Sequence, residues 1–427
     1  MNFRLAKRME ELRASEIREI LKVTQQPEMI SFAGGLPAPE VFPVRELAES
    51  AHQVLSKDGR RALQYSSSEG FPSLRQAIAA RMNATRGTSV GGNDVLITSG
   101  SQQGLDMTGK IFLDEGDVVL CESPTYLGAL NAFKVFRPKF VDVPTNDDGI
   151  VMSELERCLD RIDRIKFIYV VPDFQNPSGR CWSLERRRRF MEIVSSREVP
   201  VIEDSPYAEL CYEGEGLPAL KSFDEKNLVV YLSTFSKILS PGLRLAWLVA
   251  EPALLRKYVL VKQGTDLHTS SLIQLLVARF LGGCYLDENL RRIREVYRRR
   301  RDAMLAAIDR TFPAGVRITR PRGGLFLWVE LPEWCDATEL LARSVEQRVA
   351  FVPGSSFFPN GGHENTCRLN FSHEPCHRIR QGVERLATIL KMNFNAHGAE
   401  RRRNAAATAG EDTPLFARAA EDMRKPG

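Results

Sequence analysis

The sequence lacks the features of a membrane-bound, exported or disulfide-stabilised protein. It contains no apolar run of about 18 residues, and its first residues alternate charged and apolar side chains without the apolar core of a signal peptide. Its eight cysteines form no Cys-x-x-Cys pair, a distribution that is typical of reduced thiols and indicates neither a zinc site nor a disulfide framework. We therefore expect a cytoplasmic protein that binds no structural metal and does not cross a membrane.

The positive charge of the chain is not gathered into one tract. The net charge is only +5 over 427 residues, and the densest basic runs, 186–189 and 298–301, each lie in a helical pattern. Solvent-exposed helix faces explain these runs better than a nucleic-acid surface does. The length and the hydrophobic content of 43% predict a large core in two or more domains, with small molecules and not nucleic acid as partners.

Short apolar runs alternate with helical patterns through the first two thirds of the chain. This alternation predicts an α/β fold with a mainly parallel, seven-stranded sheet between helices, in a large domain over 41–290. Ligands of such sheets lie at the carboxyl ends of the strands. The expected strands are 95–98, 118–121, 140–143, 167–171, 199–202, 229–232 and 245–250.

The remaining segments have different patterns. Residues 8–25 form an amphipathic helical pattern, within an N-terminal arm over 1–40. A long helix over 285–310 leads into a smaller α+β domain over 291–396. Few apolar residues occur in 397–427, so we expect that tail to be disordered.

The stretch 233–244 places one lysine among small hydroxyl residues after a buried strand. A lysine near another cation and away from water has a lowered pKa, so its amine can attack a carbonyl and form a Schiff base. Hydroxyls and an arginine suit a phosphate. Together they predict a pyridoxal 5'-phosphate site with Lys237 as the reactive amine and Thr234, Ser236 and Arg244 at the phosphate. The alternative is a surface lysine in a strand-to-loop turn.

Polar residues follow other expected strands. Ser101 and Gln102 open a helix, whose free N–H groups and dipole suit a phosphate, although simple helix capping explains them too. Tyr126 could lie flat on a pyridine ring or pack in the core. Asn176 precedes a proline that fixes its backbone, and its amide could meet the phenolic oxygen of the cofactor.

A carboxylate ends the expected strand over 199–202. Asp204 needs a cationic partner if it is buried, and a protonated pyridine nitrogen would supply one. Tyr207 follows three residues later. Without a ligand, Asp204 is an ordinary strand-end aspartate that caps the next segment.

In this order along the chain, the motifs resemble those of fold-type I aminotransferases of class I/II. The likeness covers about residues 8–392 and is strongest to the 2-aminoadipate aminotransferase and kynurenine aminotransferase II subgroup. Threonine at 234 and EDSPY in place of EDDAY or EDDPY are departures that remove no required group. The motifs are SFAGGLPAPE, LQYSSSEG, ITSGSQQGLD, FQNPSG, EDSPY, STFSKILSPGLR, KQGTDLHT, PRGGLFLWVELP and VAFVPGSSFF.

The resemblance implies a role for each site residue. Lys237 would bind the cofactor and transfer the proton, assisted by Asp204 at the ring nitrogen and Tyr207 at the phenolic oxygen. The other implied cofactor contacts are Ser101, Gln102, Tyr126, Asn176, Thr234, Ser236, Arg244 and, from the partner subunit of a homodimer, Tyr65. The implied substrate contacts are Arg368 on the α-carboxylate, Asn176, Gly35 in a turn that allows close backbone approach, and Ser15 and Arg18 on the N-terminal helix.

The expected activity is transamination by a ping-pong mechanism. The amino donor would be 2-aminoadipate, glutamate, a branched-chain or an aromatic amino acid, and the acceptor a 2-oxo acid such as 2-oxoglutarate. Alternatives are a lyase, decarboxylase or cyclase that uses the same lysine. A regulator with a related domain would need a winged-helix domain, for which the roughly 30 residues before Ser31 are too few.

Overall fold

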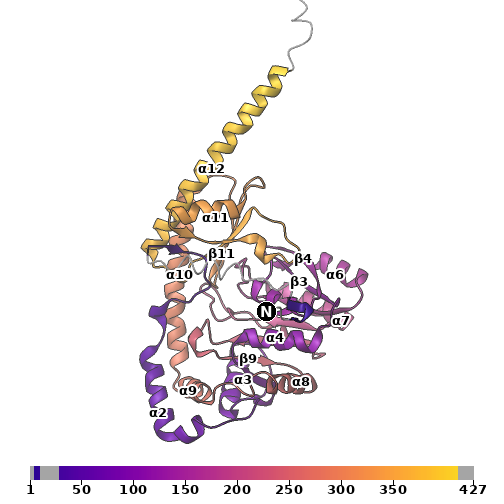
Figure 1. Ribbon diagram of the computed structural model, residues 1–427. Coiled ribbons are helices and arrows are strands. Elements are labelled where there is room, and N and C mark those ends of the chain that lie inside the picture. The colour runs from indigo at the N-terminus through magenta and orange to yellow at the C-terminus, as the bar shows by residue number, and fades with distance from the viewer. Residues whose placement is uncertain (1–3, 10–27, 412–427) are drawn as a thin grey trace, which may run out of the picture.

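The computed structural model describes residues 4–9 and 28–411 (Figure 1). Of the predicted N-terminal helix, only positions 8 and 9 are among them, in the 3-10 helix η1 (Lys7–Met9). The predicted substrate contacts Ser15 and Arg18 therefore lie outside the described residues.

A mainly parallel sheet forms the centre of the large domain. Its eight strands have the order β2-β9-β8-β7-β6-β3-β4-β5, and all seven expected strands are present. The eighth, β5, has two residues and pairs antiparallel with the end of β4, too short to give a periodic pattern. The strands are β2 (Val95–Thr98), β3 (Val118–Ser123), β4 (Lys139–Asn146), β5 (Gly149–Ile150), β6 (Ile165–Val170), β7 (Val201–Asp204), β8 (Val229–Thr234) and β9 (Ala246–Val249).

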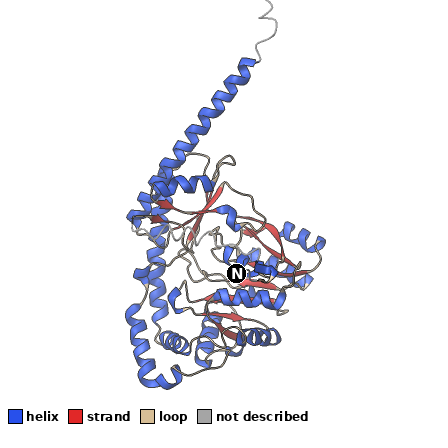
Figure 2. Ribbon diagram, in the orientation of Figure 1, coloured by secondary structure: helices blue, strands red, loops and turns tan. Residues whose placement is uncertain are grey.

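Helices enclose this sheet (Figure 2), and every residue of β2, β7, β8 and β9 is buried. Burial on both faces explains why these strands are continuous apolar runs without alternation. Among the described residues, no helix is long and apolar enough to cross a membrane. The helices of this part are α2 (Val44–Ala62), α3 (Pro72–Arg86), α4 (Ser101–Phe112), α5 (Leu127–Lys134), α6 (Met152–Arg161), α7 (Leu184–Arg197), α8 (Pro252–Gln263) and α9 (Ser271–Gly282).

The smaller domain contains an antiparallel sheet. The long helix α10 (Tyr285–Thr311) leads into its strands, whose order is β10-β11-β14-β13. The helices α11 (Ala337–Glu346) and α12 (Cys376–Glu411) pack together beside them. The N-terminal arm joins this part through β1 (Ile30–Ser31), which pairs with β12 (Val349–Ala350). The exact domain boundaries stay a prediction. The strands are β10 (Arg317–Ile318), β11 (Phe326–Glu330), β13 (Val352–Pro353) and β14 (Thr366–Asn370).

The last helix, α12 (Cys376–Glu411), projects away from the rest of the molecule (Figure 1). It continues past residue 397, where the composition predicts disorder. The physical reason is that Ala, Arg and Glu are strong helix formers. Extending a helix that is already packed avoids the cost of nucleation, so a low apolar content does not end it. Residues 412–427 lie outside the described part.

Candidate active site

The predicted site residues follow neighbouring strands of the large sheet. Strands β8, β7, β6 and β3 are adjacent and parallel. Tyr126 follows β3, Asn176 follows β6, Asp204 ends β7, and Lys237 follows β8. The carboxyl ends of parallel strands lie at the same edge of a sheet, so the fold gathers these four residues there.

Lys237 extends from the end of β8 to the N-terminal arm. Its Nζ donates a hydrogen bond to the carbonyl of Gly35 at 2.8 Å. Burial, with further contributions from the charges of Arg368 and Arg244, lowers the pKa of Lys237 to about 8. A substantial fraction of this amine is therefore neutral near pH 7 to 8, as a nucleophile requires. A side chain at position 35 would press against the ring of Phe326, so glycine permits the backbone to lie close to that ring.

Asp204 is buried with one carboxylate oxygen satisfied. Tyr169 donates its hydroxyl to Oδ2 at 2.8 Å, whereas Oδ1 has no partner among the described residues. Burial raises the pKa of Asp204 to about 6, and the Tyr169 hydrogen bond opposes this rise. A buried oxygen without a partner is costly, and a protonated ring nitrogen would satisfy it.

Arg368 lies on β14 between the rings of Phe326 and Phe357, with its guanidinium carbon 4.3 and 5.0 Å from their centres. It donates to Asn176 Oδ1 at 2.7 Å and to the carbonyl of Ala33 at 2.5 Å, and its buried Nε has no partner in the described structure. Burial lowers the pKa of Arg368 to about 10. Within the described residues no carboxylate pairs with this cation, so it is available for the carboxylate of a ligand.

The predicted phosphate contacts come from the start of α4 and the loop after β8. Gly100, with a φ of 96°, precedes Ser101 and lies against Arg244, whose guanidinium would collide with any side chain at Gly100. The first N–H groups of α4 and Arg244 thus lie close together. The side-chain amide of Gln102 donates to the carbonyl of Gly128 at 2.8 Å. The group of Gln102 that would meet a phosphate is therefore its backbone N–H at the helix start.

Thr234 is used within its own loop. Its hydroxyl accepts the backbone N–H of Ser236 at 3.1 Å and lies 3.1 Å from the carbonyl of Leu245. We therefore interpret Thr234 as a support for Ser236, whose hydroxyl lies 3.0 Å from it. Both side chains are buried.

Two tyrosines complete the group. Tyr126 is half-buried, its ring covers Gly128, and burial together with the charge of Asp204 raises its pKa to about 12. Tyr207 is buried, with its ring edge-on to Phe326 at 5.9 Å, and burial raises its pKa. Both phenols therefore stay protonated near neutral pH and can donate hydrogen bonds.

Tyr65 is the predicted contact that the single chain does not bring to this group. Its side chain is 79% exposed, in the loop after α2, and it lies edge-on to His268 at 5.8 Å. An exposed tyrosine that is held in place is compatible with a contact across a subunit interface. Its place in a partner's site stays a prediction.

Comparison with known proteins agrees with this geometry. A sequence model of the family "Aminotransferase class I and II" matches residues 28–386. The chain belongs to this family. The 2-aminoadipate transaminase of Thermus thermophilus is 47% identical over 383 residues, covering 89% of this aminotransferase and 94% of that protein. Aromatic-amino-acid aminotransferase 1 of Thermococcus litoralis is 44% identical over 384 residues, covering 89% and 92%.

Among solved structures, the alpha-aminoadipate aminotransferase of Thermus thermophilus in complex with N-(5'-phosphopyridoxyl)-L-leucine has a TM-score of 0.86. It is 45% identical, and the match covers 92% of this chain and 98% of that chain. The aminotransferase is a pyridoxal-phosphate enzyme, in keeping with its family. Its residues fit that cofactor, because Asp204 Oδ1 lacks a cation, Lys237 offers a partly neutral amine, and the start of α4 with Arg244 offers donors to a phosphate.

Asp173 and Tyr169 are site neighbours that sequence reasoning missed. Asp173 is buried and accepts from Arg187 at 2.7 Å, from Arg86 at 2.5 Å and from the hydroxyl of Ser205 at 2.9 Å. It therefore ties the loop that carries Asn176 to the residue after Asp204. The serine of EDSPY has a structural explanation, since it donates a hydrogen bond to Asp173.

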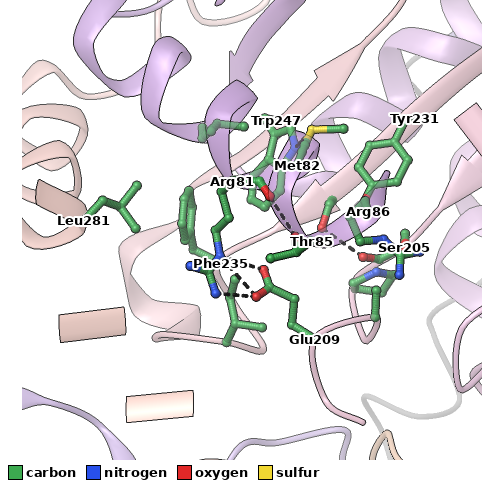
Figure 3. A pocket seen from close by; sticks show the side chains of 15 residues that line it. Arg81, Met82, Thr85, Arg86, Ser205, Glu209, Tyr231, Phe235, Trp247 and Leu281 are labelled. Carbon is green, nitrogen blue, oxygen red and sulfur yellow. Dashed lines mark hydrogen bonds and ion pairs between the residues drawn. The ribbon is translucent and has the colours of Figure 1, made fainter. Parts of the chain in front are cut away.

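A separate cavity is lined by residues of α3, β8, β9 and the loop after β7 (Figure 3). Its volume is about 20 Å³, which suffices for about one water molecule. Arg81 points to Glu209 and Arg86 to Ser205 around it, and no predicted site residue lines it. The cavity is therefore too small for an amino acid and is not the substrate site.

Proposed function

We propose that the aminotransferase moves the α-amino group of an L-amino acid to a 2-oxo acid such as 2-oxoglutarate, in two half-reactions of a ping-pong mechanism. The donors that we propose are 2-aminoadipate, glutamate, branched-chain and aromatic amino acids. The names of the relatives from Thermus thermophilus and Thermococcus litoralis support the aminoadipate and aromatic classes. The cytoplasmic location stays a prediction from the cysteine pattern.

One observation carries this proposal: a buried arginine and a half-buried lysine, neither of which pairs with a carboxylate of the described residues, face the same short segment of the N-terminal arm. Arg368 donates to Ala33, and Lys237 donates to Gly35 two residues later. A substrate α-carboxylate on Arg368 would place the α-carbon beside Lys237. Arginine suits this task because its planar guanidinium can bind both carboxylate oxygens.

The side chains have separate tasks in this proposal. Pyridoxal phosphate supplies an aldehyde that accepts the amino group and a ring that withdraws electrons. Lys237 takes the proton from the substrate α-carbon and returns it, which its lowered pKa favours near neutral pH. Asp204 stays ionised opposite the ring nitrogen. Asn176 accepts from Arg368 through Oδ1, so its amide N–H groups are directed elsewhere and can reach the phenolic oxygen.

We also propose a homodimer in which Tyr65 contacts the phosphate in the partner's site. The support is the exposure of Tyr65 together with its fixed contact to His268. Light scattering on an active preparation would measure the mass. A monomer with full activity would contradict the shared site.

A half-reaction screen tests the activity. Amino acids are added one at a time to the purified holoenzyme without a 2-oxo acid, and the visible spectrum is followed. We expect 2-aminoadipate and glutamate to convert the bound cofactor to pyridoxamine phosphate, and 2-oxoglutarate to reverse the change. Release of ammonia or of an amine, with an unchanged spectrum for every amino acid, would favour a lyase or a decarboxylase.

A further inference from the structure

A fully buried lysine lies behind the start of α4. Lys262, near the end of α8, has no exposed side-chain surface. Its Nζ donates to Asp266 at 2.8 Å, to Gln103 Oε1 at 3.1 Å and to Thr269 Oγ1 at 3.1 Å. These residues belong to α4 and to the KQGTDLHT segment, to which the activity proposed above assigns no role.

All three acceptors of Lys262 also contact Ser99. The backbone N–H of Ser99 donates to Gln103 Oε1 at 2.7 Å. Its hydroxyl donates to Asp266 Oδ2 at 2.7 Å and lies 3.1 Å from Thr269 Oγ1. One residue is thus fixed three times, and each time by a group that Lys262 also contacts.

Ser99 immediately precedes Gly100, and Gly100 is the residue on which Arg244 lies. A shift of Ser99 would therefore change the direction of the first N–H groups of α4 and their distance from Arg244. The fold alone does not need a charge here. Removing the charge of Lys262 completely from water is expensive even beside Asp266, whose side chain is 26% exposed, and apolar side chains of similar volume commonly stabilise a core as well or better.

We propose that Lys262 is a positioning residue for the phosphate of the cofactor. It does not touch the phosphate. It holds Gln103, Asp266 and Thr269 in the arrangement that fixes Ser99, and Ser99 fixes the start of α4. This inference rests on the proposed position of the phosphate at the start of α4.

Binding of two ligands that differ only in the phosphate tests the proposal. Apo-protein is titrated with pyridoxamine phosphate and with pyridoxamine, neither of which reacts with lysine, and the quenching of tryptophan fluorescence gives each Kd. For Lys262→Met we expect the affinity for pyridoxamine phosphate to fall about tenfold, the size of one charge-assisted hydrogen bond, with the affinity for pyridoxamine unchanged. The quantity of interest is the ratio of the two affinities.

Lys221→Met is the matched control. Lys221 is also largely buried, at 9% exposure, and pairs with Asp224 at 2.8 Å, but neither residue contacts the start of α4. We expect this variant to keep the wild-type ratio. Ser99→Ala provides a second test if Lys262→Met does not fold, because it removes the hydroxyl bonds and keeps the pair of Lys262 with Asp266. It should lower the same ratio several-fold.

The outcomes are distinguishable. Equal losses for both ligands in Lys262→Met, or an unchanged ratio in both Lys262→Met and Ser99→Ala, would overturn the role of Lys262. A wild-type protein that binds the two ligands equally well would instead overturn the position of the phosphate at α4. A lowered ratio in both variants, with the control unchanged, would establish the proposal.

Discussion

Replacing Tyr169 by phenylalanine removes the one hydrogen bond that the described residues donate to the side-chain carboxylate of Asp204. The bond is 2.8 Å long and buried, and it stabilises the ionised carboxylate. A hydrogen bond to a charged group contributes about 1.5 to 3 kcal/mol, and about 1.4 kcal/mol corresponds to one pKa unit. Burial already raises the pKa of Asp204 to about 6, so in Tyr169→Phe it rises above 7. The carboxyl group is then largely protonated at neutral pH and cannot pair with a protonated ring nitrogen.

The assay is the Kd of pyridoxamine phosphate between about pH 6 and pH 9, a range that spans the expected pKa values. We expect Tyr169→Phe to bind about tenfold more weakly at neutral pH, and the difference to shrink as the pH rises and Asp204 ionises. Tyr258→Phe is the control, because it loses an equally long buried bond to Thr108 away from the strand ends. Equal affinities of Tyr169→Phe and the wild type over the whole pH range would refute this reasoning.

Three further variants test the site. Lys237→Ala should lack the visible absorbance of lysine-bound cofactor and should not turn over, and retained absorbance with full activity would place the site elsewhere. In the wild type, the rate at which the apo-protein attaches the cofactor should be half-maximal near pH 8 and level off at higher pH, because the pKa of Lys237 is about 8. Arg368→Lys should lower kcat/KM about 10- to 100-fold for every donor, since lysine cannot bind both carboxylate oxygens, and should leave the Kd of pyridoxamine phosphate unchanged. An equal loss of affinity for pyridoxamine phosphate would show that Arg368 supports the cofactor instead. Arg18→Ala should lower kcat/KM for 2-aminoadipate and glutamate by about one to two decades, the value of one charge-assisted hydrogen bond, and kcat/KM for leucine or phenylalanine far less. Equal losses for both groups would mean that Arg18 does not bind the substrate side chain.

The strands and the polar residues at their ends could be predicted because both leave local signals. A buried parallel strand is a continuous apolar run; Asp204 ends β7, and Lys237 follows the end of β8 by three residues. The helix past residue 397 could not be predicted from composition, since a low apolar content predicts disorder only where no packed helix is being extended. The role of Arg368 came from the family resemblance, because nothing local distinguishes it from an ordinary arginine in a strand.

Nothing local in the sequence shows what Tyr169 and Lys262 contact, although Lys262 begins the KQGTDLHT motif. Tyr169 lies inside the apolar run of β6, where a tyrosine is indistinguishable from a core residue. Its function comes from a contact with β7 that only the pairing of the strands creates. Lys262 is 159 positions from Gln103, so its contact depends on the packing of α8 against α4, which a single sequence does not reveal.

The KQGTDLHT segment, which contacts Ser99 through Asp266 and Thr269, also contacts the loop that carries Tyr65, and so does the start of α9. His268 accepts the backbone N–H of Ser66 at 3.3 Å, and Ser271 donates to the carbonyl of Gln64 at 2.9 Å. In the proposed dimer this connection makes cofactor binding and subunit association mutually dependent. Thermodynamic linkage requires the two effects to be equal: the factor by which dimerisation tightens the cofactor is the factor by which the cofactor tightens the dimer. Dilution of the apo-protein would then produce monomers at protein concentrations at which the holoenzyme is still fully dimeric.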